Sequence, residues 1–262
     1  MRFCPLFSGS SGNCIFIEGG GVRVLVDAGL AGRTIINALA GINVSPDTID
    51  AIVVTHEHSD HIKGVGVLSR RYSIPVYANS ATWDAMSPLI GEVAPSCVRI
   101  FETDRDFFIR ELNVLPFATP HDAAESVGYC FNHKGAQVST LTDVGHINAR
   151  LLSAVQESDI ILLESNHDVE MLKAGSYPYT LKRRILGDNG HLSNDAAGEA
   201  LVKLYKCGLR NAVLGHLSHE NNLEPLALET VRQALRNEDI FDEEFSLCVA
   251  HRDRAAGMFE IE

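Results

Sequence analysis

Thr55-His56-Glu57-His58-Ser59-Asp60-His61 follows directly on the largely apolar stretch 49–54, which predicts a buried strand. Five of these seven residues carry an imidazole or a carboxylate. Alternate residues of an extended chain point the same way, so His56 and His58 can bind one ion together. A polar loop with surface histidines is the alternative, and the position directly after a buried strand disfavours it.

The last two of these side chains extend the prediction to a second ion. Asp60 and His61 stand where the chain is expected to turn into a helix, and both could reach a neighbouring position. Imidazole and carboxylate donors together favour zinc, with manganese or iron as alternatives. The segment therefore predicts a site for two divalent metal ions.

The composition is that of a globular protein with a sizeable core. The chain has 262 residues, 45% of them hydrophobic and 21% charged, which excludes disorder as the main state. A net charge of −12 disfavours a protein that coats nucleic acid, unless its basic residues are concentrated on one face. The six cysteines are scattered singly, which favours buried thiols in a reducing compartment. We find no signal-peptide pattern and no apolar stretch of about 18–20 residues, so we expect no membrane association and a cytoplasmic location.

The pattern of hydrophobic residues predicts strands that first form hairpins and later alternate with helices. This order indicates sheets covered by outer helices, in one α/β (α+β) domain spanning residues 1–262. The predicted strands are 14–17, 22–26, 49–54, 75–78, 98–101, 107–109, 112–117, 127–131, 137–142, 160–164, 211–214 and 245–250. The predicted helices are 34–39, the segment from the histidine cluster to about 71, one from Ser80, and 149–158, 194–207 and 225–236.

An H-x-H-x-D-H cluster after a core strand resembles the signature of the metallo-β-lactamase superfamily. The resemblance extends along most of the chain through single residues that each follow a predicted strand: Asp27, His121, Asp143 and His216. It implies a four-layer αβ/βα sandwich of two mixed β-sheets flanked by helices, with a dinuclear site at the sheet edges.

The resemblance also assigns the metal ligands and one structural residue. It implies that one ion is bound by His56, His58 and His121, and the other by Asp60, His61 and His216. Asp143 is expected to bridge the two ions, and Asp27 to orient the metal loop. A carboxylate between two cations offsets charge on both.

Four further motifs narrow the resemblance to the YycJ (WalJ)-like branch of bacterial phosphodiesterases. This likeness implies a metal-dependent phosphodiesterase, a 5′-to-3′ exonuclease on DNA with a possible role in mismatch repair. A hydroxide held by the ions is expected to attack the phosphodiester. The motifs are Ser8-Gly9-Ser10-Ser11-Gly12-Asn13, Glu164-Ser165-Asn166-His167-Asp168, Gly190-His191-Leu192-Ser193-Asn194 and Gly215-His216-Leu217-Ser218-His219-Glu220-Asn221-Asn222.

Three residues are candidates for catalysis. His191 precedes a helix that Ser193 or Asn194 can cap, and the positive helix end attracts phosphate. His191 could therefore bind phosphate or protonate the leaving oxygen, although a plain loop and cap is the alternative. Glu164 ends a predicted strand and could pair with His191, which would fix its tautomer and raise its pKa. Asp60 could orient the attacking hydroxide.

The candidate substrate contacts come from four segments, and each has a structural alternative. The first serine–glycine run could offer phosphate its backbone N–H groups or simply form a tight turn. The polar residues after Glu164 could instead stiffen a loop. A basic stretch with interleaved Tyr177 and Tyr179 suits phosphate pairing and base stacking, or an ordinary amphipathic helix. The residues concerned are Ser10, Ser11, Asn13, Asn166, His167, Lys182, Arg183, Arg184 and His219.

Two other functions remain open from the sequence. A small-molecule hydrolase, such as a glyoxalase II-like thioesterase or a cyclic-phosphate diesterase, would use the same ligands. A non-enzymatic regulatory protein would be expected to lack ligands, and all seven are present here. The sequence does not fix the oligomeric state.

Overall fold

In the computed structural model, which describes residues 1–261, the first of two mixed β-sheets is built from strands within residues 2–100 and from the strand 259–260. Its two halves differ in direction: β1, β2, β3 and β14 pair antiparallel, whereas β3 to β6 pair in parallel. The strand order is β14 (Phe259–Glu260), β1 (Arg2–Phe7), β2 (Cys14–Gly19), β3 (Val22–Val26), β4 (Ala51–Val53), β5 (Val76–Ala78) and β6 (Val98–Ile100).

The second sheet repeats this arrangement. Strands β7 to β10 form an antiparallel meander, and β10 to β13 continue in parallel. The strand order is β13 (Ser246–Val249), β12 (Asn211–Gly215), β11 (Ile160–Glu164), β10 (Ala136–Leu141), β9 (Val127–His133), β8 (Leu112–Ala118) and β7 (Phe107–Ile109).

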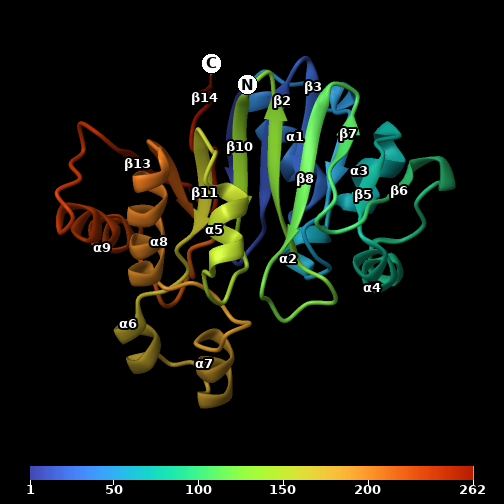
Figure 1. The fold of residues 1–262 in the computed structure, drawn as a ribbon. Helices are drawn as coiled ribbons and strands as arrows, with labels where there is room; N and C mark the ends of the chain where they lie inside the picture. The colour runs from blue at the N-terminus through green and yellow to red at the C-terminus, as the bar shows by residue number, and fades with distance from the viewer. Residues whose placement is uncertain (262) are drawn as a thin grey trace.

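Helices cover the outer face of each sheet (Figure 1). The outer face of the first sheet packs on α1 (Gly32–Gly41), α3 (Val65–Tyr72) and α4 (Ser80–Ile90). That of the second sheet packs on α5 (Ala149–Val155), α8 (Asn194–Cys207) and α9 (Glu224–Arg236). The remaining helical segments are α2 (Ser59–Ile62), α6 (Val169–Ala174), α7 (Tyr179–Ile185) and the 3₁₀ turns Pro46–Thr48 and Pro95–Cys97.

Three apolar layers hold these four layers of structure together. The middle layer joins the facing sides of the two sheets, and alternating residues of one strand supply different layers. In β11, Ile160 and Leu162 point to the middle layer, whereas Ile161 and Leu163 pack under the outer helices. The predicted fold class, two mixed sheets flanked by helices, is therefore confirmed.

The parallel half of each sheet determines where the candidate site lies. Parallel strands end at the same edge, and ligands of such sheets bind at the carboxyl ends. Asp27 and His216 directly follow β3 and β12, and Asp143 is the second residue after β10. These three residues have φ angles of 61°, 56° and 55°, in the left-handed region that few non-glycine residues occupy. The chain therefore turns at each of these three strand ends through a conformation that is uncommon for non-glycine residues.

Most predicted elements are present, and the differences have local causes. The predicted hairpin around 18–21 is confirmed, with Gly20 and Gly21 at φ 60° and 76° in the turn. The first strand, β1, was not predicted: Pro5 interrupts its pattern, and the pairing with β2 shifts register between Pro5 and Phe7. The basic stretch after Asp168 forms two short helices, α6 and α7, which project from the body of the molecule in Figure 1.

Within residues 1–261, no helix is both long enough and apolar enough to cross a membrane.

Candidate metal centre

Three imidazole nitrogens converge beside the carboxyl end of β4. His56 Nε2 lies 3.0 Å from His58 Nδ1, which lies 3.3 Å from His121 Nε2. The first two come from the loop after β4, and His121 comes from the loop after β8. Thr55 Oγ1 lies 3.0 Å from His56 Nδ1 and can accept a proton donated by it. In that tautomer, His56 Nε2 carries a lone pair and no proton. Two such nitrogens can share a proton, or all three can direct their lone pairs at one metal ion.

A second set of donors lies next to the first. Asp60 Oδ2 is 3.6 Å from both His61 Nε2 and His216 Nε2. Asp60 and His61 belong to α2, whose single turn directs both side chains toward the end of β12, where His216 stands. This set brings together residues more than 150 positions apart in the chain.

Asp143 lies between the two sets. Its Oδ2 is 3.3 Å from His61 Nε2, and its Oδ1 is 3.6 Å from His216 Nε2 and 3.8 Å from His121 Nε2. One carboxylate thus faces members of both sets, as a bridging ligand must. The structure brings together all seven side chains that the resemblance implied as ligands.

The far nitrogens of these rings are held by other groups. Asp27 Oδ2 accepts from His61 Nδ1 at 2.8 Å, and Glu164 Oε1 accepts from His216 Nδ1 at 2.8 Å. His121 Nδ1 donates to the Gly190 carbonyl at 3.1 Å. Such outer contacts fix the tautomer in which Nε2 carries the lone pair that a metal can bind.

The electrostatics of the site favour cations. Burial lowers the pKa of His61, but the Asp143 and Asp27 carboxylates outweigh it and raise the pKa to about 9. Burial likewise opposes protonation of His216, yet the Asp143 carboxylate and its neighbours raise its pKa well above the usual range. In contrast, burial and the neighbouring imidazoles lower the pKa of His56 well below its ordinary value. The carboxylates thus create a negative potential that two divalent ions would neutralise.

The donor set fits divalent metal ions. Asp143 Oδ2 and His216 Nε2 are buried and have no hydrogen-bond partner among the described residues. Unpaired buried polar atoms are costly unless another ligand satisfies them. Four groups of side chains here could each hold an ion, among them the two sets described above.

His191 stands beside this cluster on Glu164. Its Nδ1 donates to Glu164 Oε1 at 2.7 Å, the same oxygen that His216 uses, and Glu164 Oε2 accepts from the Val144 and Leu192 N–H groups. The His191 ring lies 5.1 Å from that of His121 and 5.3 Å from that of His216, and its side chain is 19% exposed. Burial lowers the pKa of His191, but Glu164 outweighs burial and raises it. The predicted pairing of Glu164 with His191 is present.

The helix after His191 begins as predicted. Ser193 caps α8, its hydroxyl accepting from the Ala196 N–H at 3.2 Å. His191 therefore lies two residues before the cap of a 14-residue helix.

The loop between β1 and β2 places two exposed serines and one buried asparagine next to the site. Ser10 and Ser11 are exposed beside the cluster, whereas Asn13 is buried and its Nδ2 lies 3.1 Å from His61 Nε2. Asn13 Oδ1 also accepts from the Gly9 N–H, which closes the loop. Asn13 thus supports the site from inside, and the two serines are open to a ligand.

Three of the expected substrate contacts require correction, because Asn13, Asn166 and His167 are all buried. Asn166 and His167 are 4% and 1% exposed, so neither reaches a position open to substrate. Asn166 Nδ2 donates to the His216 carbonyl at 2.9 Å, and its own carbonyl accepts from Asn222. Asn166 therefore has the structural role given above as the alternative: its side chain stiffens the loop by holding the backbone of His216.

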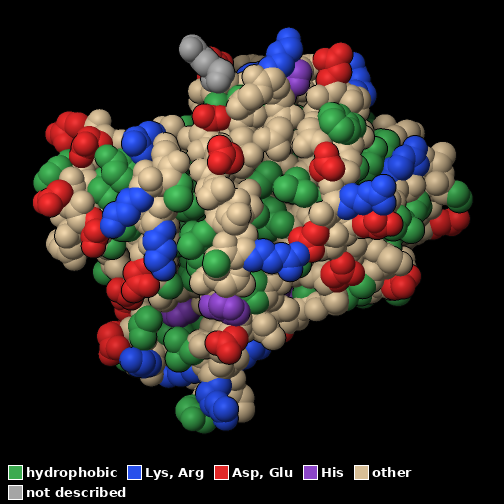
Figure 2. Space-filling view, in the orientation of Figure 1, with side chains coloured by type: hydrophobic (Ala, Val, Ile, Leu, Met, Phe, Trp, Pro, Cys, Tyr) green, Lys and Arg blue, Asp and Glu red, His purple; other side chains and the backbone are tan. Residues whose placement is uncertain are grey.

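The basic residues of α7 are partly engaged within the protein. Arg184 Nη2 donates to Asp122 Oδ1 at 2.9 Å, and Lys182 Nζ donates to the Lys173 and Gly175 carbonyls at 2.7 Å each. The Arg183 guanidinium lies 6.0 Å from the ring of Tyr179. His219 is exposed and pairs with its neighbour Glu220. Figure 2 shows histidine side chains at the surface between the body and the projecting α6–α7 segment.

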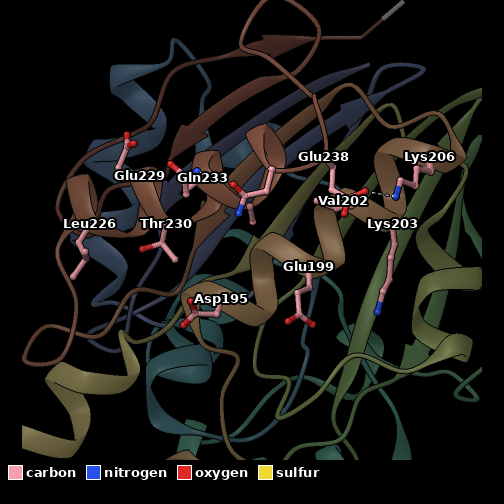
Figure 3. Close-up of a pocket in the computed structure, with 12 residues that line it drawn as sticks. Asp195, Glu199, Val202, Lys203, Lys206, Leu226, Glu229, Thr230, Gln233 and Glu238 are labelled. Atoms are coloured by element: carbon pink, nitrogen blue, oxygen red, sulfur yellow. Dashed lines mark hydrogen bonds and ion pairs between the residues drawn. The ribbon is translucent and has the colours of Figure 1, made fainter.

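A hollow and a cation beside Asp60 were not predicted. Lys63 follows the histidine cluster by two residues and lines this hollow together with Leu89 of α4. In the sequence, only the position of Lys63 just after the histidine cluster could have indicated its role. No local pattern marks Leu89, which the fold brings to the hollow. A larger cavity, of about 810 Å³, lies elsewhere, between α8 and α9 (Figure 3), and none of the described residues lining it is a candidate ligand.

Comparison with known proteins defines the class to which this fold and site belong. A model of the β-lactamase superfamily domain matches residues 22–217, a span that includes all seven candidate ligands, so the chain belongs to this superfamily. Zn(2+)-bound PqqB from Methylobacterium extorquens shares the fold, with a TM-score of 0.76 at 18% identity over 100% of both chains.

Within the superfamily, the narrower family is that of the exodeoxyribonucleases WalJ and YycJ. Exodeoxyribonuclease WalJ of Streptococcus pneumoniae serotype 2 is 43% identical over 242 residues, which cover 92% of this chain and 90% of that protein. Exodeoxyribonuclease YycJ of Bacillus anthracis is 39% identical over 235 residues, 90% of this chain and 89% of that one. The family resemblance inferred from the sequence motifs is thereby confirmed.

Proposed function

We propose that this protein is a metal-dependent exodeoxyribonuclease that hydrolyses the phosphodiesters of DNA from the 5′ end. The observation that carries the proposal is the convergence of seven donor side chains from both sheets at one edge. Similarity to WalJ and YycJ over nine tenths of the chain supports DNA as the substrate class.

Two divalent ions, zinc or manganese, fit the two donor sets. His56, His58 and His121 would hold one ion, and Asp60, His61 and His216 the other, with Asp143 shared. Bound there, the ions would supply Lewis acidity for the phosphate and a lowered pKa for the attacking water.

The chain's own groups would act on both sides of the phosphate. The Asp60 carboxylate, with its side chain 24% exposed, accepts a hydrogen bond from the attacking water and orients it. His191 has its Nδ1 proton held by Glu164, so Nε2 is the nitrogen available to the substrate. A protonated His191 donates to a non-bridging oxygen or to the leaving oxygen, and Glu164 stabilises that charged form.

The small-molecule hydrolase alternative is not favoured, because the relatives with 39–43% identity are named exodeoxyribonucleases. A role in mismatch repair and a cytoplasmic location remain part of this proposal. Free cysteines, four of them buried, support a reducing compartment.

The test is hydrolysis of bis-p-nitrophenyl phosphate by the manganese-loaded protein and its variants. Because His58 and Asp60 serve different ions, H58A and D60A are each expected to lower kcat/KM by at least about 10³-fold. His133→Ala, a histidine at the end of β9 outside the cluster, serves as the control and is expected to keep full activity. Circular dichroism checks that each variant is folded. Folded H58A and D60A with parental turnover would refute the proposal.

A further inference from the structure

A hollow of about 440 Å³ opens beside Asp60, which forms part of its lining. Four segments of the chain meet around it: the β1–β2 loop, the turn after β3, the helix α2, and the end of α4. The residues that line it are Ser10, Ser11, Gly29, Ser59, Asp60, Ile62, Lys63 and Leu89.

The hollow is continuous with the candidate metal centre through one side chain. Asp60 lines the hollow, and its Oδ2 lies 3.6 Å from both His61 Nε2 and His216 Nε2. A group bound in the hollow would therefore be separated from the candidate metal centre by the Asp60 side chain.

The wall formed by the β1–β2 loop is fixed by backbone contacts. The Asn13 N–H donates to the Asp60 carbonyl at 2.8 Å, and the Gly29 N–H donates to the Asn13 carbonyl at 2.8 Å. A Cβ at Gly29 would lie 1.6 Å from the Asp60 carbonyl oxygen, so this close approach requires glycine. A bridge between Gly9 and Leu217 ties the loop to the residue after His216. The wall is thus preorganised rather than shaped by a ligand.

The lining offers groups for both parts of a nucleotide. Lys63 is exposed, and among the described residues its ammonium forms no ion pair, unlike Arg184 with Asp122. Ser10 and Ser11 add exposed hydroxyls on the opposite wall. Leu89 is 67% exposed, which leaves an apolar face against which a base can pack.

We propose that this hollow binds the terminal nucleotide of the DNA strand, with phosphate oxygens at Lys63 and the two serines and the base against Leu89. The inference rests on the proposed exonuclease function and adds the subsite that makes cleavage terminal. A pocket of this volume falls at the lower end of the range of about 300–1,000 Å³ for small-molecule sites, enough for one nucleotide. With one terminal nucleotide bound there, we expect the protein to release mononucleotides.

The first test measures binding of deoxyadenosine 5′-monophosphate by isothermal titration calorimetry, to manganese-loaded and to metal-stripped full-length protein. Lys63→Gln removes a charge-assisted contact and is expected to raise the Kd about tenfold in both forms. Leu89→Ala is expected to raise the Kd for this nucleotide about threefold and to affect inorganic phosphate less, because it removes only apolar contact.

The matched controls lie outside the hollow. Lys134→Gln replaces an exposed lysine in the β9–β10 turn, and Ile100→Ala removes an apolar side chain that is 64% exposed on β6. Both controls are expected to bind as the parent does. Equal Kd values for Lys63→Gln, Leu89→Ala and the controls would overturn the inference.

The second test separates this inference from the proposed function. If the parent degrades a labelled duplex but releases oligonucleotides, or if Lys63→Gln degrades it as fast as Lys134→Gln, the terminal-nucleotide subsite is wrong and the nuclease stands. If the metal-loaded parent hydrolyses neither DNA nor bis-p-nitrophenyl phosphate, the proposed function itself fails. Mononucleotide release that slows at least about fivefold in Lys63→Gln supports both.

Discussion

Single carboxylates connect the fold to the chemistry of this site. Asp27 accepts hydrogen bonds from the Thr55 N–H, the Thr55 hydroxyl and His61 Nδ1, each at 2.8 Å. One side chain at the end of β3 therefore fixes both the start of the histidine segment and the orientation of its last ring. Glu164 does the same in the second sheet for His191 and His216. Outer contacts of this kind are expected to matter nearly as much as the ligands themselves.

The raised pKa of His61 predicts how the metal-free protein responds to pH. Burial lowers this pKa, but Asp143 and Asp27 raise it to about 9, whereas a histidine in the unfolded chain titrates near about 6.5. The folded state thus binds this proton more tightly, so the stabilisation is complete below pH ~6.5 and is lost as pH rises through about 9.

We therefore expect the Tm of protein stripped with EDTA to fall between pH 6.5 and 9, and scanning calorimetry measures it. With manganese bound, the ion keeps the imidazole neutral and supplies the charge, so the Tm should not fall across this window. The same fall with and without metal would contradict this account of His61.

Among the elements, α7 is the one most directly tied to the site without contributing a ligand. Arg184 of α7 pairs with Asp122, the neighbour of His121, and the Ile185 carbonyl accepts from the His191 N–H at 3.0 Å. This helix therefore holds the loops that carry His121 and His191. Arg183, another basic residue of this helix, lies by Tyr179, which is 73% exposed.

Arg183 is the α7 cation best placed to contact the DNA backbone, because Arg184 pairs with Asp122 and Lys182 donates to two backbone carbonyls, whereas the Arg183 guanidinium has neither kind of partner among the described residues. Arg183→Gln is expected to weaken duplex binding about threefold to tenfold and to reduce the slope of log Kd against log salt by about one. Fluorescence anisotropy in calcium at several salt concentrations measures both. Lys206→Gln on α8, whose lysine pairs with Glu238, is the control, and equal slopes for the two variants would rule out this contact.

Across the whole molecule, the sequence predicts the ligands better than it predicts the surfaces around them. The histidine cluster and the later single residues are found together because strand ends in parallel sheets share an edge. The strand β1 and the hollow at Lys63 depend on contacts between distant segments, which no local pattern records. Burial of Asn166 and the pairing of Arg184 are likewise set by packing, so residue type alone misassigned their surroundings.

The net charge of −12 is compatible with a polyanionic substrate only if binding is local. Two divalent ions would add about +4 at the strand edge, next to Lys63 on one side and α7 on the other. The acidic residues 238–244 follow the end of α9, a helix of the outer layer. Electrostatic attraction is therefore expected to act on one face of the molecule.

The central claim is that the seven converging side chains form a metal-dependent nuclease site acting from the 5′ end. The most direct measurement is digestion of duplex DNA, labelled at either the 5′ or the 3′ end, by manganese-loaded and by EDTA-treated protein. We predict early release of the 5′ label as a mononucleotide, late release of the 3′ label, and no release after EDTA treatment. Release that is independent of metal, or no release of either label by the loaded protein, would contradict the account.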